Sequence, residues 1–255
     1  MYNYLSLVYV FAFIYGALVG SFANVLIIRL PKNENWIIDS SHCIKCGHKI
    51  KWWMNIPLLS FFLLRGKCYF CKKNISLQYP LVELLCAVKA VALAYFYIED
   101  LELFTFLNFL HMDLILVLLI VHFFIDVKHQ ILPDIINILL LILGLLYVYK
   151  LDDWKPNLIG ALVGFLGPLL ITYLFFQIRG QVGLGGGDIK LFGVIGLFLG
   201  WQGIIQTLLY SSVLGIVVAG ALIALGKLKR QDPFAFGPSI IIIFVIQLYL
   251  PGLLP

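Results

Sequence analysis

Long, nearly uninterrupted apolar runs constrain the fold of this chain more than any other feature of its sequence. Hydrophobic residues make up 62% of the 255 residues and charged residues 12%, and the mean hydropathy is +1.01. A soluble domain carries about twice that charged fraction. Several runs reach the ~20 residues that a helix needs to cross a bilayer. The sequence therefore predicts an all-α polytopic membrane protein, and its net charge of +5 gives no reason to expect a nucleic-acid partner.

The apolar runs divide into about eight candidate transmembrane helices. The sixth is too short to cross alone and is expected to tilt or to include flanking residues. The predicted spans are 5–28, 80–98, 104–125, 135–149, 158–178, 191–199, 204–225 and 238–250.

Three parts are expected along the chain. Residues 1–30 form a first transmembrane helix, read as retained because no basic start or cleavage site stands out. Residues 31–78 form a polar insertion, and residues 79–255 form a seven-helix bundle. No internal repeat or low-complexity tract is expected.

The charges predict an orientation. Nine Lys and Arg lie between Arg29 and Lys73, whereas the loops on the opposite side are mainly acidic. The positive side of a membrane protein is cytoplasmic. The polar insertion and the loops of Asp126 and Asp188 are therefore expected inside, and both chain ends outside.

The polar insertion carries four of the five cysteines, in two Cys-x-x-Cys pairs that are 21 residues apart. Two such pairs are typical of a tetrahedral zinc site, and four thiolates leave no open position for a substrate. A small insertion with little apolar core also needs a metal ion or another cross-link to stay folded, and a cytosolic location disfavours disulfides. We predict a structural zinc on Cys43, Cys46, Cys68 and Cys71. The alternative is a pair of redox-active or incidental dithiols. Cys86 is expected to be a small buried apolar residue.

Two aspartates stand in polar breaks between apolar runs. Asp126 opens Asp-Val-Lys-His-Gln-Ile-Leu-Pro-Asp, and Asp188 closes Gly183-Leu-Gly-Gly-Gly-Asp. Ionisable residues at membrane depth are costly and are functional candidates. Two close carboxyls share a proton, so one can activate water while the other protonates a carbonyl. The sequence thus predicts an aspartyl hydrolase; for Asp188 alone, a helix cap is the simpler interpretation.

Other polar residues receive structural expectations. Asp134 is expected to cap a helix or, less favoured, to support the catalytic site, and Lys190 to face lipid headgroups or, less favoured, to pair with a carboxylate. Asn24 and Arg29 are expected at headgroups, helix ends or substrate.

Within the spans, Glu83 and Lys89 are expected to satisfy each other or a neighbour. Asp113 and His111 are expected to pair or to line a polar seam. The histidines other than His111 are expected to be surface or interface residues: His42, His48, His122 and His129.

The motifs together resemble the type IV prepilin peptidases, in order and over nearly the whole chain. They are Gly20-Ser-Phe-Ala-Asn-Val25, Arg29-Leu-Pro31, the cysteine pairs, Asn55-Ile-Pro-Leu-Leu-Ser60, Arg65-Gly-Lys-Cys68, Tyr79-Pro-Leu-Val-Glu83, Asp126 to Asp134, Gly183 to Lys190 and Phe236-Gly-Pro238. Ile44 and Gln78 depart from a proline and an arginine that are common in the family.

The resemblance implies an inner-membrane aspartyl protease that removes the leader from prepilin or pseudopilin substrates. In most members it also implies N-methylation of the new amino terminus with S-adenosylmethionine. We expect that donor where the polar insertion meets the bundle, near Glu83. The alternatives are a leader peptidase without methyltransferase activity, a transporter with functional carboxylates, and a zinc-dependent sensor or scaffold.

Overall fold

The protein is all-helical among the residues that the structure, a computed structural model, describes, namely 2–98, 102–181, 183–229 and 232–250. Two isolated β-bridges lie in the polar insertion. Contacts divide the chain into an N-terminal unit, residues 1–121, and a C-terminal unit, residues 122–255. The helices are α1 (Tyr2–Arg29), η1 (Leu30–Lys32), η2 (Trp52–Asn55), α2 (Leu59–Leu63), α3 (Gln78–Tyr97), α4 (Leu103–His129), α5 (Asp134–Tyr149), α6 (Lys155–Arg179), α7 (Gly186–Ala224) and α8 (Gly237–Tyr249).

All eight predicted apolar segments lie in helices of the described chain to within one residue at their ends. Five helices are long and apolar enough to cross a membrane: α1, α3, α4, α6 and α7. The apolar helices α5 and α8 are shorter, with 16 and 13 residues. The predicted sixth and seventh segments form the single 39-residue element α7, which is interrupted at Gly200 (φ 70°, ψ −177°). A membrane protein with five candidate spanning helices is therefore confirmed, while eight separate spans remain a prediction.

The N-terminal unit is built on the pairing of α1 with α3. A Cβ at Gly16 would lie 2.7 Å from the Cβ of Ala90, and one at Gly20 would lie 2.7 Å from the Cα of Glu83. Small residues four apart let two apolar helices approach closely when lipid gives no hydrophobic driving force between them. This close approach brings the polar ends of α1 and α3 together beneath the cysteine-containing insertion.

The polar insertion contains two turns of the same design, one for each Cys-x-x-Cys pair. The Cys43 N–H bonds the carbonyl of His48, and the Cys68 N–H bonds that of Lys73, both at 2.9 Å. In each turn the residue after the second cysteine is left-handed: Gly47 (φ 72°) and Lys72 (φ 57°). A bridge closes each turn, His42 with Lys49 and Lys67 with Asn74.

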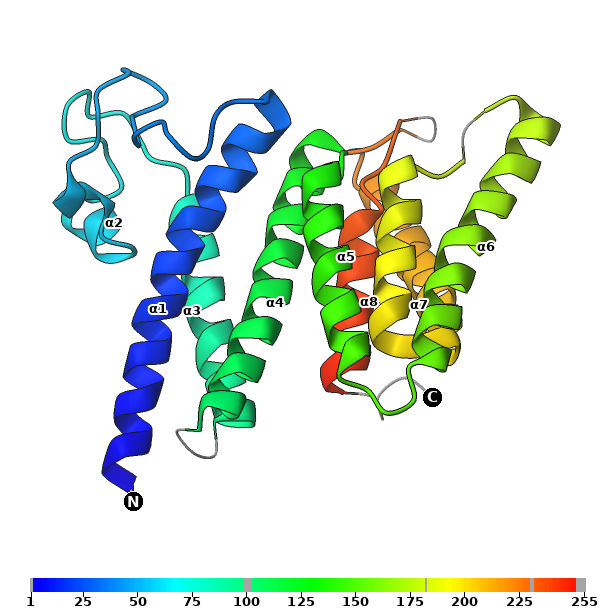
Figure 1. Ribbon diagram of the computed structural model, residues 1–255. Coiled ribbons are helices and arrows are strands. Elements are labelled where there is room, and N and C mark those ends of the chain that lie inside the picture. The colour runs from blue at the N-terminus through cyan, green and yellow to red at the C-terminus, as the bar shows by residue number, and fades with distance from the viewer. Residues whose placement is uncertain (1, 99–101, 182, 230–231, 251–255) are drawn as a thin grey trace. The chain divides into compact units, whose positions relative to one another are not determined.

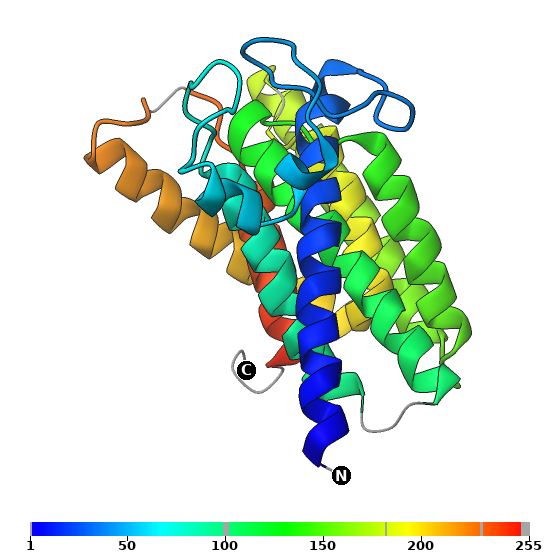
Figure 2. The ribbon, with the colours of Figure 1, turned by 90° about the vertical axis from the view of Figure 1, so that its left-hand side faces the viewer.

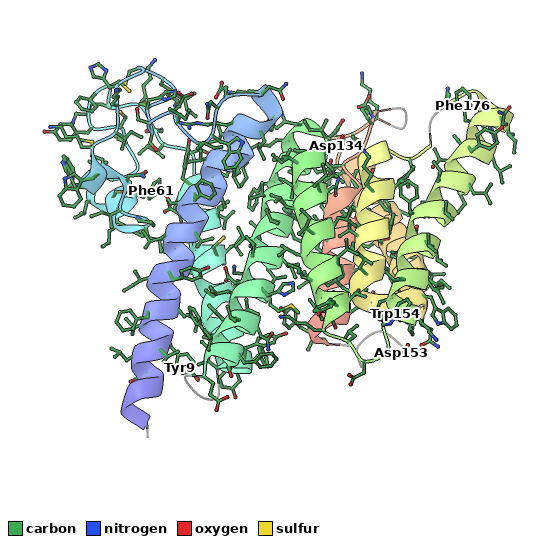
Figure 3. All side chains as sticks on the ribbon, viewed as in Figure 1. Tyr9, Phe61, Asp134, Asp153, Trp154 and Phe176 are labelled. Atoms are coloured by element: carbon green, nitrogen blue, oxygen red, sulfur yellow. The ribbon has the colours of Figure 1, made fainter. Side chains whose placement is uncertain are left out.

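The C-terminal unit packs α5, α6 and α8 against α7. Figure 3 shows Asp134, at the start of α5, and Asp153, in the turn after it, at opposite ends of this unit. His122, which was expected at a surface or interface, is instead fully buried, and its Nε2 lies 3.2 Å from Asn137 Oδ1. A buried polar group requires a partner, and Asn137 on α5 provides one.

Candidate active site

Asp126 lies in the last turn of α4 and is 4% exposed. Its Oδ2 accepts a hydrogen bond of 2.9 Å from the backbone N–H of Gly237, the first residue of α8. The N-terminus of a helix favours a negative charge because its first N–H groups have no partner within the helix. The fold thus holds this carboxyl by a backbone donor from a helix that is remote in sequence.

Asp188 lies in the first turn of α7, three residues after the N-cap residue Gly185. The backbone N–H of Gly185 donates a hydrogen bond to the carboxyl group of Asp188. This is half of a capping box, in which an acidic side chain reaches back to the N-cap amide. The capping interpretation of Asp188 is therefore correct as local structure, and it fixes the direction of the carboxyl.

One cavity of about 250 Å³ is lined by both aspartates. Its other walls come from the segment after α4 and from the glycines before Asp188: Gln130, Ile131, Leu132, Gly185, Gly186 and Gly187. The structure therefore brings together two carboxyls that lie 62 positions apart in the printed sequence.

The three glycines before Asp188 adopt ordinary backbone conformations. None of Gly185, Gly186 and Gly187 has a positive φ; Gly185 is extended (φ −66°, ψ 143°) and the next two begin the helix. Their contribution is the absent side chain, since a Cβ at Gly187 would lie 2.8 Å from the Cβ of Leu132. The run therefore allows close packing beside Asp188 rather than an unusual backbone conformation.

Gly237 is a site residue that the sequence did not assign. It was noted only within Phe236-Gly-Pro238, with no role. The available signal was a glycine followed by proline at the start of an apolar run, which is a helix N-terminus where backbone donors are free. Which carboxyl those donors would meet depended on the tertiary fold.

Asp134 and Lys190 form a salt bridge of 2.6 Å between the starts of α5 and α7. The expected capping role of Asp134 was wrong: Pro133 occupies the N-cap position, and no side chain caps the helix. For Lys190 the less favoured alternative, a carboxylate partner, is the one observed. Both side chains are substantially exposed, so the pair is a surface salt bridge that links α5 to α7 and does not line the cavity.

The four cysteines of the insertion form a cluster. Their Sγ atoms all lie within 4.8 Å of one another. The backbone N–H of Cys71, together with that of Phe70, lowers the pKa of Cys68 to about 6. Desolvation and the neighbouring thiols raise the pKa of Cys46 to about 11, so metal binding has to displace the proton of Cys46. Thiolate is the form that binds metal, and four thiolates at this spacing fit a tetrahedral zinc. Cys86 is fully buried, as predicted.

A second cavity, of about 730 Å³, lies in the N-terminal unit between the insertion and the ends of α1 and α3. Its walls combine polar groups with aromatic and aliphatic ones, including Asn24, Glu83, Phe61, Leu64, Tyr79 and Cys68. Pockets for small organic molecules are typically of this size and mixture.

Glu83 at the wall of this cavity has a partner that no sequence pattern indicated. Its Oε2 accepts a hydrogen bond of 2.8 Å from the backbone N–H of Leu58. Leu58 has φ 62° and ψ −55°, and the N–H of Leu59 bonds the carbonyl of Pro57, which defines a γ-turn of the rare, strained kind. Glu83 therefore holds a strained turn of the insertion against α3.

Of the two alternatives expected for Glu83 and Lys89, each other or a neighbour, the structure shows the second. Lys89 forms a salt bridge of 2.6 Å with Asp113 on α4, and Asp113 also accepts a hydrogen bond of 3.3 Å from the Tyr15 hydroxyl of α1. The side chains of Lys89 and Asp113 are only 11% and 1% exposed. This buried group connects three helices of the N-terminal unit.

Arg29 and Asn24 both donate to backbone carbonyls, but only Asn24 does so at a helix end, which was one of the three expectations for them. The Arg29 guanidinium donates to the carbonyls of Asn35, Asp39 and Ser40, and so it folds the chain that leaves α1. Asn24 donates to the carbonyl of Tyr79 in the first turn of α3, at 3.1 Å.

Two family models match the chain. The bacterial peptidase A24 N-terminal domain matches residues 14–97, and the type IV leader peptidase family matches residues 114–220.

Curated relatives cover most of the chain. The chain is 36% identical to the "Prepilin leader peptidase/N-methyltransferase" of Xanthomonas campestris, over 89% of this chain and 86% of the relative. Relatives with the same name from Pseudomonas putida (36% identity, 91% of this chain, 86% of the relative) and Pseudomonas aeruginosa (35%, 89% and 85%) are similarly close. No solved structure matches the chain.

Proposed function

The chain belongs to the type IV leader peptidase family, and we propose that Asp126 and Asp188 are the carboxyls with which it cleaves its substrate. The substrate is a type IV prepilin, from which the enzyme removes the leader peptide and whose new amino terminus it N-methylates. The observation that carries the catalytic assignment is the single cavity that both aspartates line.

Cleavage by this pair needs one ionised and one protonated carboxyl. Two neighbouring carboxyls share a proton because both cannot ionise cheaply at short range. The ionised one takes a proton from water as that water attacks the scissile carbonyl, and the protonated one donates to the carbonyl oxygen. The backbone N–H groups of Gly237 and Gly185 hold the two carboxyls in place during this exchange.

We propose that the substrate enters from the membrane, with its basic leader in the cytosol. The excess of Lys and Arg between Arg29 and Lys73 supports a cytoplasmic location for the insertion and for the ends of the helices that carry the aspartates. We retain a topology of eight spans. Six helices cross once each, namely α1, α3, α4, α5, α6 and α8, and α7, which is broken at Gly200, crosses as two segments. In this arrangement the apolar helix of the prepilin lies along the bundle, within lipid.

The cysteine cluster is proposed to bind one structural zinc through Cys43, Cys46, Cys68 and Cys71. Four thiolate ligands close the coordination sphere, so the ion stabilises the fold of the insertion instead of taking part in catalysis. The two matched turns, each with a bridge and a left-handed residue, support a structural role.

The cavity of about 730 Å³ is proposed as the site of the methyl donor. S-adenosylmethionine, when bound, supplies an electrophilic methyl group on a positively charged sulfur. The buried Glu83 carboxylate and the aromatic rings of Tyr79 and Phe61 could hold such a cation. The double name of the relatives favours this two-activity form over a peptidase without methyltransferase activity.

The function is tested by incubating the purified protein with a prepilin, with and without S-adenosylmethionine, and by mass spectrometry of the new amino terminus. Without the donor, we expect a cleaved prepilin with an unmodified amino terminus. With the donor, we expect a cleaved prepilin that carries one added methyl group. An intact prepilin in both reactions would contradict the proposal.

Two Glu83 substitutions separate binding from scaffolding. Glu83→Gln removes the charge but keeps an oxygen that can accept from the Leu58 N–H, whereas Glu83→Ala removes both. If the carboxylate binds the donor, both variants lose methylation of a pre-cleaved pilin while cleavage of the intact one persists. If Glu83 only holds the turn, Glu83→Gln methylates normally.

A further inference from the structure

The short helix α2 presents apolar side chains on two opposite sides. Ser60, Phe61 and Leu64 line the cavity of the N-terminal unit. The other side carries Leu59, Phe62 and Leu63, which are 59%, 71% and 75% exposed. Residues at i, i+3 and i+4 share one face of a helix, so these three form one outward apolar surface, here called the α2 outer face.

The turn η2, which contacts α2, carries another exposed apolar side chain. Trp52 in that turn is 81% exposed, although the adjacent Met54 is buried and Trp53 packs edge-to-face on Tyr69. Exposed apolar residues scattered singly are ordinary, but several large ones on adjoining elements mark an interaction surface.

The position of α2 along α3 tells which partner that surface meets. The hydrogen bond from the Leu58 N–H to Glu83 fixes the start of α2 beside the second turn of α3. Glu83 lies five residues into a membrane-spanning helix that begins at Gln78, which is a depth of about 7 Å at 1.5 Å per residue. Figures 1 and 2 agree in showing α2 level with the first turns of α3 instead of beyond the end of α1, and Figure 3 shows Phe61 at that level.

The neighbouring faces and charges fit a lipid bilayer. On α3 the exposed residues Leu81, Leu84, Leu85 and Val88 form a stripe at helical spacing, as a lipid-facing helix does. Exposed basic residues flank the α2 segment on both sides, Lys51 before it and Arg65 and Lys67 after it. Tryptophan belongs to the membrane–water interface, and Lys and Arg reach its anionic headgroups from there.

We propose that Trp52 and the α2 outer face insert into the cytoplasmic lipid interface and anchor the cysteine-containing insertion to the membrane surface. Interfacial helices bury their apolar side about 5–10 Å into the headgroup and acyl boundary, which matches the depth set by Glu83. In this position α2 separates the cavity on its inner side from lipid on its outer side. The strained turn at Leu58 and its Glu83 acceptor hold the helix there.

The test uses the fluorescence of a single tryptophan in the full chain. Trp36, Trp53, Trp154 and Trp201 are replaced by Phe, and the protein is placed in single-occupancy nanodiscs of phosphatidylcholine and phosphatidylglycerol. We expect blue-shifted emission from Trp52, quenching by lipid with a spin label near the headgroup, and little quenching by aqueous iodide. The matched control is a Trp-free chain with Lys49→Trp, which places the probe on an exposed cysteine turn and should respond to iodide alone.

A second variant ties the result to α2. Phe62→Ser with Leu63→Ser should shift Trp52 emission to the red and remove the lipid quenching, while an unchanged metal content shows that the insertion is folded. Equal iodide quenching of Trp52 and the Lys49→Trp control would overturn the proposal. Shielding of Trp52 that arises only on addition of a prepilin helix would also overturn it, because the occupant would then be the substrate.

Discussion

The backbone N–H of Gly237 donates a hydrogen bond of 2.9 Å to Oδ2 of Asp126, across 111 positions of the sequence. This contact places the positive end of α8 against one of the two carboxyls that share the candidate site. It also explains why a glycine begins α8, because a Cβ there would lie 2.8 Å from the same oxygen. The start of α7 orients Asp188 in a similar way, through the backbone N–H of Gly185.

We predict that Asp126→Asn and Asp188→Asn each abolish prepilin cleavage without unfolding the protein. An amide can neither take the proton from water nor give one to the carbonyl, so the shared-proton mechanism fails. Cleavage is measured by mass spectrometry and folding by thermal unfolding in detergent. Near-normal turnover in either variant would refute the pair.

Two further aspartates serve as controls for that experiment. Asp134→Asn should cleave almost normally, because it loses only an exposed salt bridge, an interaction worth about 0–1 kcal/mol. Asp153→Asn, at the opposite end of the C-terminal unit, should have no effect.

Gly237→Ala should reduce cleavage by about tenfold to hundredfold, because a displacement of about 1 Å in a reacting group can cost that much. The added Cβ collides with Asp126 Oδ2 and pushes the carboxyl away from the amide. The control is Gly220→Ala in α7, where a Cβ would meet nothing within 4 Å. That variant should cleave normally and gain up to about 1 kcal/mol of helix stability. Equal cleavage by the two variants would remove Gly237 from the site.

The purified protein should contain about one zinc per chain, the stoichiometry of a closed four-thiolate site. Cys43→Ser or Cys71→Ser should lower the metal content and loosen the insertion, as measured by metal analysis and limited proteolysis. Cys86→Ser, at a buried position remote from the cluster, should keep the metal. Two disulfides in a metal-free protein would contradict the zinc assignment.

Labelling with a membrane-impermeant thiol reagent should reach Lys128→Cys only from the cytosol and Asp152→Cys only from outside. Lys128 lies in the last turn of α4 and Asp152 follows α5, and these two helices run in opposite directions in an eight-span topology. The native cysteines are replaced in this background. Labelling of both positions from one side would exclude the topology and the orientation together.

Asp113→Asn should destabilise the protein by about 3–5 kcal/mol, because it leaves the Lys89 ammonium buried without its ionised partner. Joint replacement, Lys89→Met with Asp113→Leu, should be much milder because no charge remains buried. Tyr15→Phe loses one hydrogen bond and should cost about 1 kcal/mol. Thermal unfolding measures all three; equal stability of Asp113→Asn and the wild type would contradict the role of the ion pair.

The sequence by itself determined the helical membrane class, the extents of the apolar segments and the cysteine cluster. These properties are local: an apolar run long enough to cross a bilayer becomes a helix, and two close pairs of cysteines form two turns. It also identified Asp126 and Asp188 as candidates, since each stands in a polar break between apolar runs. The resemblance of their motifs to those of one family predicted the activity for which the relatives are named.

Only the tertiary structure decided which polar groups meet. It selected neighbours for Glu83 and Lys89, namely Leu58 and Asp113, where the sequence had also allowed the two to pair with each other, and it moved Asp134 from a helix cap to a salt bridge with Lys190. It also assigned Gly237 to Asp126. The physical reason is that a buried polar group needs a partner, but any of several groups can satisfy it, and helix packing determines which one lies within reach.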